Sequence, residues 1–561
     1  MCGFAGFVSV PFPGNAESLL QGMGNKIAHR GPDADGTWCY PDAGLGLVHR
    51  RLAIQDLSPL GAQPMHSGTD RYTIVFNGEI YNFLALRAEL EKLGVTFRGH
   101  SDTEVMLEAF DAWGIPAALD RFNGMFAFAL WDRDTQELTL ARDRLGEKPL
   151  YYGTQAGNLV FGSELKALKV HPSWQGDIDR NAITLLLRHN LIPAPHTIYE
   201  NVFKLPPASF ITFSLPTSLA ALPEPQRYWR LESAFGDSPG SVEQQPLAAV
   251  ADQLERCLSE VIEQQMISDV PLGAFLSGGI DSSTVVALMQ RIGSEPVRSF
   301  SIGFEEPGFN EAEHAKAVAA HLGTRHTEMY VSPDDALALI PRLPVFYDEP
   351  FADSSQLPTF LVSQMTRQHV TVALSGDGGD ELFCGYPRYL SVASAWRRRG
   401  TFNARARRLA TAFPPALMAQ LVTAMVPGQR GRAAASVEER LRQERGSALA
   451  ENLAEFYRQK VSFWADPERL VKSAREPDYA LTLPVPESFA ADPLKSLMWL
   501  DLNWYLPDDI LVKVDRAAMA CSLETRVPML DRRVVEFALS IPTALNVENG
   551  QGKRVLRLKG G

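Results

Sequence analysis

A glycine-rich segment in the middle of the chain has the composition of an anion site. Residues 277–283 read SGGIDSS, between an apolar run at 270–276 and a mostly apolar, helix-like run at 284–292. In such a strand–loop–helix, backbone N–H groups and the helix N-terminus attract an anion, and Asp281 could hold a magnesium ion. No Gly-Lys-Ser/Thr follows, so this is not a Walker loop. The segment predicts a phosphate site, with a simple tight turn as the alternative.

The N-terminus offers a different chemistry. Removal of Met1 would leave Cys2 as the first residue, with a thiol nucleophile and a free α-amine to act as its base. Cys2 could instead be an incidental residue at a poorly ordered end. Three polar segments beside apolar runs favour the catalytic interpretation: HRGPD (29–33) with HRRLAI (49–54), FNGEIYN (76–82) and SDTE (101–104). Asn77-Gly78 could also be only a hairpin turn, and Ser101 only a helix N-cap.

Composition narrows the class of protein. The chain has 561 residues, 45% of them hydrophobic, a net charge of −12 and a pI of about 5.5. Such length predicts several domains, and the acidic balance argues against nucleic-acid binding. Five scattered cysteines without a C-x-x-C pair argue against disulfides and zinc, and no apolar run reaches membrane-spanning length. We therefore expect a cytoplasmic protein without membrane or nucleic-acid partners.

Taken together, the N-terminal segments resemble the glutaminase domain of the N-terminal-nucleophile amidotransferases, in the class-II type found in asparagine synthetases. The resemblance implies an α+β fold, an αββα sandwich of two antiparallel sheets between helices, and strand-like stretches at 125–131, 138–142 and 159–162 agree with it. It implies that Cys2 attacks the side-chain amide of glutamine and that Asn77 and Gly78 form the oxyanion hole. The glutamine-binding residues implied are Arg51, Asn77, Glu79 and Asp102.

The second half alternates strand-like and helical stretches, which predicts a parallel α/β sheet. An amphipathic helix is expected at 247–266, strands at 297–303 and 324–331, and a helix at 311–322. A short apolar run at 370–374 ends in a second acidic glycine-rich loop, SGDGGDE (375–381). Both loops follow strands, so both are expected at the carboxyl edge of one sheet, where α/β proteins bind ligands.

This half resembles the ATP-pyrophosphatase (PP-loop) domain of the same enzymes. The resemblance implies that ATP binds and that a substrate carboxylate attacks its α-phosphate, giving an acyl-adenylate which ammonia opens. It implies magnesium at Asp281 and Asp380. The implied ATP-binding residues are Leu276, Ser277, Gly278, Gly279, Asp281, Ser282, Ser283, Ile302, Ser375 and Gly376. Candidates for the acidic substrate or the intermediate are Asp377, Tyr386, Asp515 and Arg516, and for the last two a buried structural ion pair is the alternative.

Two features depart from this picture. Residues 396–445 contain eleven arginines and three glutamates, which we interpret as a solvated helical insertion rather than an RNA surface. Residues 553–557 resemble a segment of the family, and family members continue well beyond it. In them, the segment that follows supplies a lysine near the α-phosphate. Lys553 and Lys559 do not match that lysine. We therefore expect a truncated sequence or an impaired synthetase half.

The prediction is thus a two-domain ligase. Residues 2–212 form the glutaminase domain, 213–246 a linker, and 247–561 the PP-loop domain. The expected function is a glutamine-dependent asparagine synthase that converts aspartate, glutamine and ATP to asparagine, glutamate, AMP and pyrophosphate, with magnesium and as a homodimer. One alternative amidates another carboxylate, such as a uronic acid of a surface polysaccharide. A second is a catalytically impaired regulatory homologue.

Overall fold

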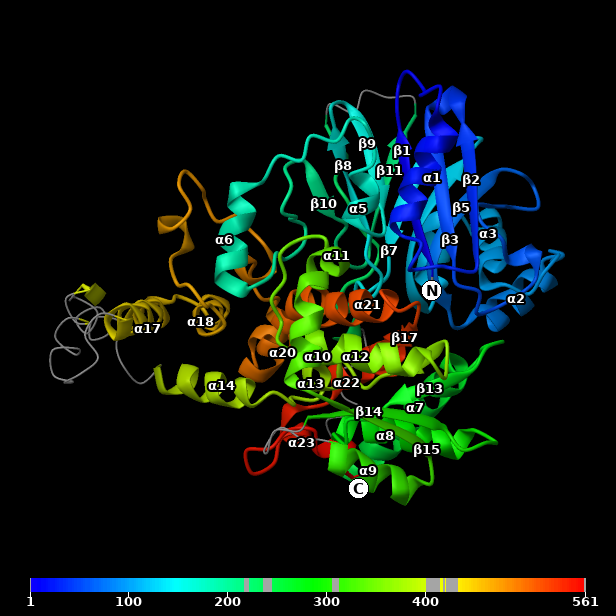
Figure 1. Ribbon diagram of the computed structural model, residues 1–561. Helices are drawn as coiled ribbons and strands as arrows, with labels where there is room; N and C mark the ends of the chain where they lie inside the picture. The colour runs from blue at the N-terminus through cyan, green and yellow to red at the C-terminus, as the bar shows by residue number, and fades with distance from the viewer. Residues whose placement is uncertain are drawn as a thin grey trace.

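The computed structural model describes residues 2–215, 221–235, 245–304, 312–399, 414–416, 419 and 432–558 (Figure 1). The N-terminal half lies at the top of Figure 1 and holds two antiparallel sheets, and the C-terminal half below it holds a parallel sheet. Within the described residues, no helix is long and apolar enough to span a membrane.

Each antiparallel sheet has six strands. The first has the order β10 (Val202–Lys204), β8 (Tyr151–Gln155), β9 (Asn158–Gly162), β1 (Gly3–Val8), β3 (Leu45–Arg51), β2 (Ala34–Tyr40). The second has the order β12 (Gln226–Arg227), β11 (Ser209–Ser214), β7 (Glu137–Arg142), β6 (Gly124–Asp132), β5 (Tyr72–Ile80), β4 (Met65–His66).

Strand β1 shows why the two sheets stack between helices. Its residues alternate in direction, as in any strand. Phe4 and Val8 pack into a core made by both sheets, whereas Ala5 and Phe7 pack against the helical side. Helices α1 (Ala16–Lys26) and α5 (Leu165–Leu168) cover the first sheet, and α2 (Phe83–Lys92), α3 (Asp102–Trp113) and α4 (Ile115–Arg121) cover the second. This is the predicted αββα sandwich.

The C-terminal half is built on a five-stranded sheet whose pairings are all parallel. The order is β15 (Arg325–Val331), β14 (Arg298–Phe304), β13 (Leu272–Phe275), β16 (Val372–Leu374), β17 (Glu524–Arg526). Helices α7 (Leu247–Gln265), α8 (Ile280–Ile292), α9 (Ala312–Leu322) and α12 (Gln356–Arg367) pack around it. The predicted α/β class is confirmed, and β13 and β16 are neighbours, so the loops that follow them meet at one edge.

Further helices surround these two units. Helix α6 (Arg180–His189) belongs to the first half. In the second half, α14 (Pro387–Arg399), α17 (Arg432–Leu449) and α18 (Leu453–Lys460) lie on one side of the molecule, at the left of Figure 1. The remaining helices are α10 (Pro333–Leu339), α11 (Leu343–Tyr347), α13 (Gly379–Leu382), α19 (Glu487–Ala490), α20 (Pro493–Asn503), α21 (Leu511–Met519), α22 (Arg532–Ser540), α23 (Thr543–Asn546) and α24 (Arg554–Arg557).

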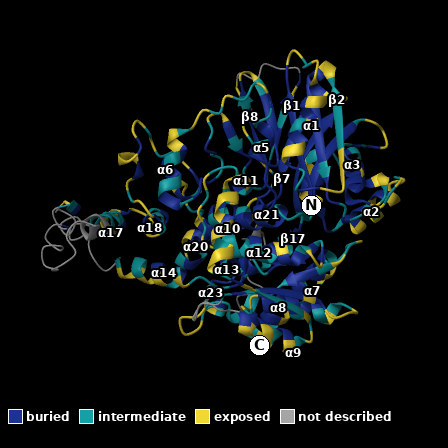
Figure 2. Ribbon diagram, in the orientation of Figure 1, coloured by how far each residue is buried: buried dark blue, intermediate teal, exposed yellow. Residues whose placement is uncertain are grey.

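Several predicted elements are present with shifted ends. The strands expected at 125–131 and 138–142 are β6 and β7, and the amphipathic helix at 247–266 is α7. Much of the arginine-rich segment 396–445 lies outside the described residues, as do residues 216–220 and 236–244 of the predicted linker 213–246. Figure 2 shows burial concentrated in the sheets and at α21, where the two halves meet.

Two local alternatives are also decided. Asn77 and Gly78 are not a hairpin turn, because they lie inside β5 and pair with Ala127 and Phe126 of β6. Ser101 does cap α3, since its hydroxyl accepts a hydrogen bond from the Glu104 N–H at 3.2 Å. The carboxylate of Glu104 bonds the backbone of Arg98 and Gly99 rather than completing a capping box.

Candidate functional sites

The Cys2 site lies where the two antiparallel sheets face each other. Gly3 of β1 pairs with Arg50 of β3, which places Cys2 beside Arg51. From the second sheet, Asn77 accepts a hydrogen bond from the Cys2 N–H at 3.0 Å. Cys2 is buried, and burial raises the pKa of its thiol. Cys2 is therefore held in a fixed position by groups from both sheets.

Asn77 has an amide group suited to stabilising an oxyanion. Its Oδ1 is occupied by Cys2, but its Nδ2 is buried and has no hydrogen-bond partner among the described residues. A buried donor without a partner is rare in proteins and often marks a functional site. The neighbouring Gly78 leaves no room for a side chain, because a Cβ there would lie 2.1 Å from the carbonyl oxygen of Met125.

The three other predicted glutamine-binding residues carry charges of both signs. The guanidinium of Arg51 is fixed by the carbonyl oxygens of Asp56 and Ser58. Glu79 is buried, its Oε2 has no partner among the described residues, and burial raises its pKa well above the usual range. Burial also raises the pKa of Asp102 to about 6. A guanidinium and two buried carboxyl groups are the kinds of group that bind the carboxylate and the ammonium of an amino acid.

The two glycine-rich loops touch each other at the edge of the parallel sheet. A Cβ on Gly376 would lie 2.6 Å from the Ser282 N atom, and one on Gly379 would lie 2.5 Å from the Asp281 carboxyl carbon. Gly278 has φ +78° and packs against the backbone of α9, so it too must be glycine. Because these glycines have no side chain, the two loops can pack closely together and form one cradle.

A cavity of about 400 Å³ opens over this cradle. Its lining includes nine of the predicted residues: Ser277, Gly279, Asp281, Ser282, Ser375, Gly376, Asp377, Asp380 and Tyr386. Four predicted ATP-binding residues do not line it: Leu276, Gly278, Ser283 and Ile302. Leu276 is buried in the core, and Ser283 lies in the first turn of α8 with its hydroxyl buried and without a partner among the described residues.

The acidic side chains of this cavity already hold a cation of the protein. The Lys553 ammonium contacts Asp281 Oδ2 and lies 2.6 Å from Asp380 Oδ1. Asp281 Oδ1 is buried without a partner among the described residues, and burial, opposed by Lys553, raises the pKa of Asp281 to about 6. These oxygens are the ligands that magnesium prefers, and a phosphate-bound magnesium needs only one or two carboxylates. The described residues contain no cluster of three metal-ligating side chains.

Comparison with known proteins now gives the family. The sequence model described as asparagine synthase matches residues 253–558, more than half of the chain, and the glutamine amidotransferase domain model matches residues 1–229. The chain belongs to the asparagine synthase family. It is 34% identical to asparagine synthetase [glutamine-hydrolyzing] 1 of Bacillus subtilis, over 99% of this chain and 84% of that protein. It is 36% identical to a putative asparagine synthetase [glutamine-hydrolyzing] of Mycobacterium tuberculosis, with the same coverage.

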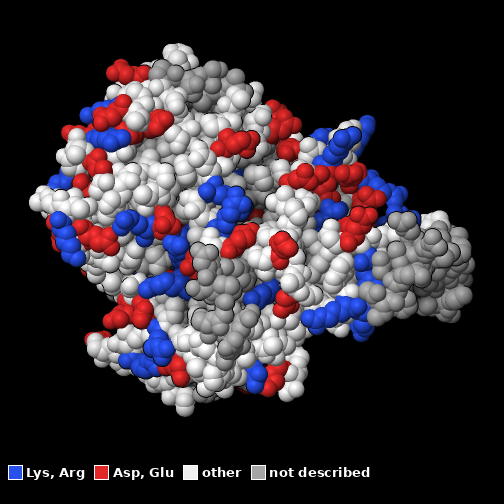
Figure 3. Space-filling view, turned by 180° about the vertical axis from the view of Figure 1, so that it is seen from behind, with Lys and Arg blue, Asp and Glu red and all other residues white. Residues whose placement is uncertain are grey.

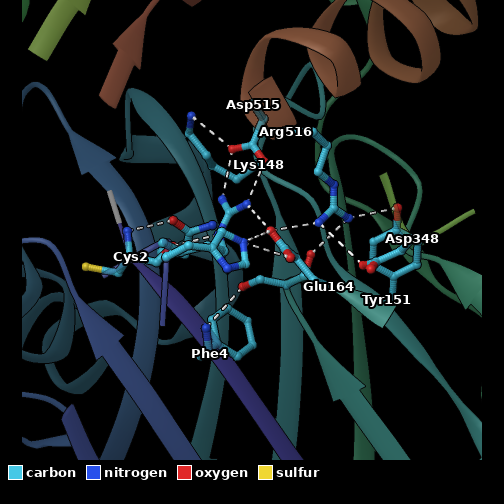
Figure 4. Close-up of polar contacts among 12 residues, drawn as sticks. Cys2, Phe4, Lys148, Tyr151, Glu164, Asp348, Asp515 and Arg516 are labelled. Carbon is cyan, nitrogen blue, oxygen red and sulfur yellow. Dashed lines mark hydrogen bonds and ion pairs between the residues drawn. The ribbon is translucent and has the colours of Figure 1, made fainter. Parts of the chain in front are cut away.

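A buried network of charges connects the two halves of this family member (Figure 4). Arg30 donates from Nε to the Cys2 carbonyl at 3.1 Å and from both terminal nitrogens to Asp515 at 2.8 and 2.9 Å. It also bonds Glu164 at 2.9 Å, and Glu164 pairs with Arg516 at the same distance. Arg516 in turn lies 3.7 Å from Asp348. The backbone of Cys2 is thus connected through Arg30 to helix α21 of the second half.

This placement bears on two predicted residues. Asp515 and Arg516 were candidates for contact with the acidic substrate, but neither lines the cavity over the glycine loops. Asp515 pairs with Arg30 and Arg516 pairs with Glu164, and all four side chains are almost completely buried. Although burial opposes it, Arg30 holds the pKa of Asp515 below its usual value. The geometry agrees with the alternative of a structural ion pair.

Sequence reasoning missed several residues of both sites. Lys553 was set aside because it does not match the family's late lysine, and its place in the cavity depends on a contact between Lys553 N and Phe383 O at 2.8 Å. Arg526 lies in the second half, yet its Nη2 is 3.6 Å from Glu79 of the glutaminase site. No local sequence pattern predicts these contacts. The position of Arg526 in a short buried strand could, however, have indicated that it has a buried partner of opposite charge.

Asp515→Asn tests the connecting network. We expect a loss of about 3 kcal/mol in the free energy of unfolding, because one partner of a buried ion pair is removed. Urea unfolding followed by tryptophan fluorescence measures it. The matched control is Asp35→Asn, since Asp35 is exposed and lies 3.6 Å from Arg50; its loss should be below about 1 kcal/mol. Equal losses in the two variants would contradict the role given to Asp515.

Lys553→Met tests the cation in the glycine-loop cavity. We expect kcat/KM for ATP in pyrophosphate release to fall at least about 10-fold, because a charge-assisted donor to the phosphates is lost. Glutamine hydrolysis should be unchanged, since Lys553 is outside the Cys2 site. Lys472→Met, at an exposed position, serves as the control. An unchanged ATP dependence would show that Lys553 does not act in this cavity.

Proposed function

We propose that this protein is a glutamine-dependent asparagine synthase. It hydrolyses glutamine at Cys2 and uses ATP to adenylate the side-chain carboxylate of aspartate, which ammonia converts to asparagine with release of AMP. The observation that carries this proposal is one chain with two distinct sites, a buried thiol beside Asn77 and a glycine-loop cavity, tied together through Arg30 and Asp515. The asparagine synthetase names of its relatives agree with it.

In the first half-reaction, the Cys2 thiolate attacks the amide carbon of glutamine. The free amine left by removal of Met1 accepts the thiol proton and passes it to the departing ammonia. The unpartnered Nδ2 of Asn77, with the Gly78 N–H, donates to the oxyanion. Arg51 binds the α-carboxylate of glutamine, and Glu79 and Asp102 bind its α-ammonium. Water then hydrolyses the thioester to glutamate.

In the second half-reaction, the loops at 277–283 and 375–378 bind the phosphates of ATP through backbone N–H and serine hydroxyl groups. The carboxylate oxygen attacks the α-phosphorus, and the bond to the β-phosphate oxygen breaks. Asp281 and Asp380 would hold magnesium, which supplies charge neutralisation when bound. The Lys553 ammonium, now between these carboxylates, adds a second positive group at the same place.

The remaining partners follow from the same proposal. Substrates are small molecules, and the protein acts in the cytoplasm as a homodimer without binding nucleic acid. On the face shown in Figure 3, basic and acidic side chains lie in small mixed groups rather than in one basic tract. The net charge of −12 also opposes association with a polyanion. Within the part of the chain that the structure describes, no feature favours a uronic acid as the acceptor or a purely regulatory role.

Cys2→Ala tests the two-site proposal. Glutamine-dependent asparagine formation should fall at least about 1,000-fold, because the nucleophile is lost. Asparagine formation from ammonium chloride, ATP and aspartate should persist near the wild-type rate, since the glycine-loop cavity is untouched. Cys39→Ala, which changes a partly exposed cysteine outside the site, should leave both activities intact. Equal loss of both activities in Cys2→Ala would overturn the proposal.

A further inference from the structure

Strand β17 contacts both sites. It forms one edge of the parallel sheet, where Arg526 pairs with Leu374 of β16. The carbonyl oxygen of Arg526 accepts a hydrogen bond from the Ser375 N–H at 2.9 Å, where the second glycine-rich loop begins. The side chain of Arg526 reaches the first half, since its Nη2 lies 3.6 Å from Glu79 Oε1. A single residue of the second half therefore joins the glycine-loop cavity to the Cys2 site.

The guanidinium of Arg526 is fixed by hydrogen bonds within the second half. Its Nε donates to Glu524 at 2.6 Å, and its Nη1 donates to the carbonyl oxygens of Gln265 and Ile267, both at 2.7 Å. The side chain is completely buried, yet its Nη2 has no hydrogen-bond partner among the described residues. Buried polar atoms are almost always paired, so an unpaired one calls for a functional explanation. This nitrogen is the one that lies nearest to Glu79.

Glu79 is in a matching state on the other side of this contact. It lies in β5, it is buried, and its Oε2 also has no partner among the described residues. Burial and the neighbouring carboxylates Glu524 and Asp102 raise the pKa of Glu79 well above its usual range. Arg526 and the N-terminal amine oppose this change. The other titratable groups that its charge affects are Cys2 and Tyr81.

Only a charged Glu79 can form an ion pair with the α-ammonium of glutamine. A cation within about 4–6 Å of a carboxyl group typically lowers its pKa by about 1–3. We propose that Arg526 is a positioning residue for glutamine binding: it keeps Glu79 in the carboxylate form and holds it in place to receive the α-ammonium. This inference rests on the proposed function and deepens it, because a residue of the second half then completes the glutamine site.

Glutamine binding at different pH values tests this inference. L-Glutamine is titrated calorimetrically into the full-length Cys2→Ala protein, which cannot hydrolyse it and has no thiol to titrate in the site. Binding should weaken as the pH falls, because Glu79 becomes protonated. In Arg526→Gln, made in this parent, the pKa of Glu79 should rise. The loss of binding should then occur at a pH higher by about 1 or more, and binding at neutral pH should be at least about 10-fold weaker.

Two further variants separate the effect of charge from that of structure. Glu524→Gln removes a negative charge beside Glu79, so the loss of binding should move to lower pH. Arg526→Lys keeps the positive charge, so its pH dependence should stay close to that of the parent although the hydrogen bonds of the guanidinium are lost. A role confined to packing would not shift the pH dependence in opposite directions in Arg526→Gln and Glu524→Gln.

The matched control is Arg188→Gln. Arg188 is also almost completely buried and joins the same two halves through Glu476, at 2.5 Å. Its loss should lower the free energy of unfolding, because it leaves a buried carboxylate without its partner, but it should leave the pH dependence of glutamine binding unchanged. Cooperative urea unfolding, followed by tryptophan fluorescence, shows for each variant that the protein is folded before glutamine is added.

The outcomes distinguish this inference from the proposed function. Opposite shifts of the pH dependence in Arg526→Gln and Glu524→Gln, with Arg526→Lys and Arg188→Gln like the parent, support the role of Arg526. The same pH dependence in the parent and in every variant would overturn the inference and leave the proposed function standing. A parent that binds no glutamine at any pH would overturn both. If Arg526→Gln does not fold, Glu524→Gln decides alone, by a shift to lower pH or by none.

Discussion

The Arg30 guanidinium is the constraint on which both sites depend. It bonds the Cys2 carbonyl, Glu164 and Asp515 at once, and it is completely buried. An unpaired arginine in such a position would be strongly unfavourable, so the three acceptors must stay in place together. One of them belongs to Cys2, and another, Asp515, lies in helix α21 two residues after Lys513, which lines the glycine-loop cavity. Neither half can therefore shift without disturbing the other.

Features encoded by neighbouring residues could be predicted from the sequence, whereas contacts between the two halves could not. The fold class, the Cys2 site and the glycine loops are encoded locally, by strand alternation and by glycines beside acidic residues. Asn77-Gly78 shows the limit even of a local motif. Its sequence fits a hairpin turn equally well, and only the pairing of β5 with β6 makes it part of a strand. Which interpretation applies was decided by tertiary structure.

The contacts that could not be predicted join residues that are far apart in the chain. Arg30 and Asp515 are 485 positions apart, and Lys553 and Asp281 are 272 apart. Nothing in the sequence near Lys553 distinguishes it from a surface lysine. Its position in the cavity follows from the hydrogen bond that its backbone N–H donates to the Phe383 carbonyl, just before α24 begins. Asp515 and Arg516 were predicted as candidates for contact with the acidic substrate, with a structural ion pair as the alternative. Their burial with opposite charges, which favours the alternative, is a tertiary property.

Buried polar atoms without a partner link the two sites to the chemistry assigned to them. Asn77 Nδ2 belongs to the Cys2 site and Asp281 Oδ1 to the glycine-loop cavity, and both atoms are buried without a partner among the described residues. Burying such an atom unpaired costs about 1–3 kcal/mol. A fold that keeps this cost at two sites gains binding energy at each when a bound substrate supplies the missing partner. The same buried polar atoms thus lower the stability of the free protein and contribute binding energy when substrate is present.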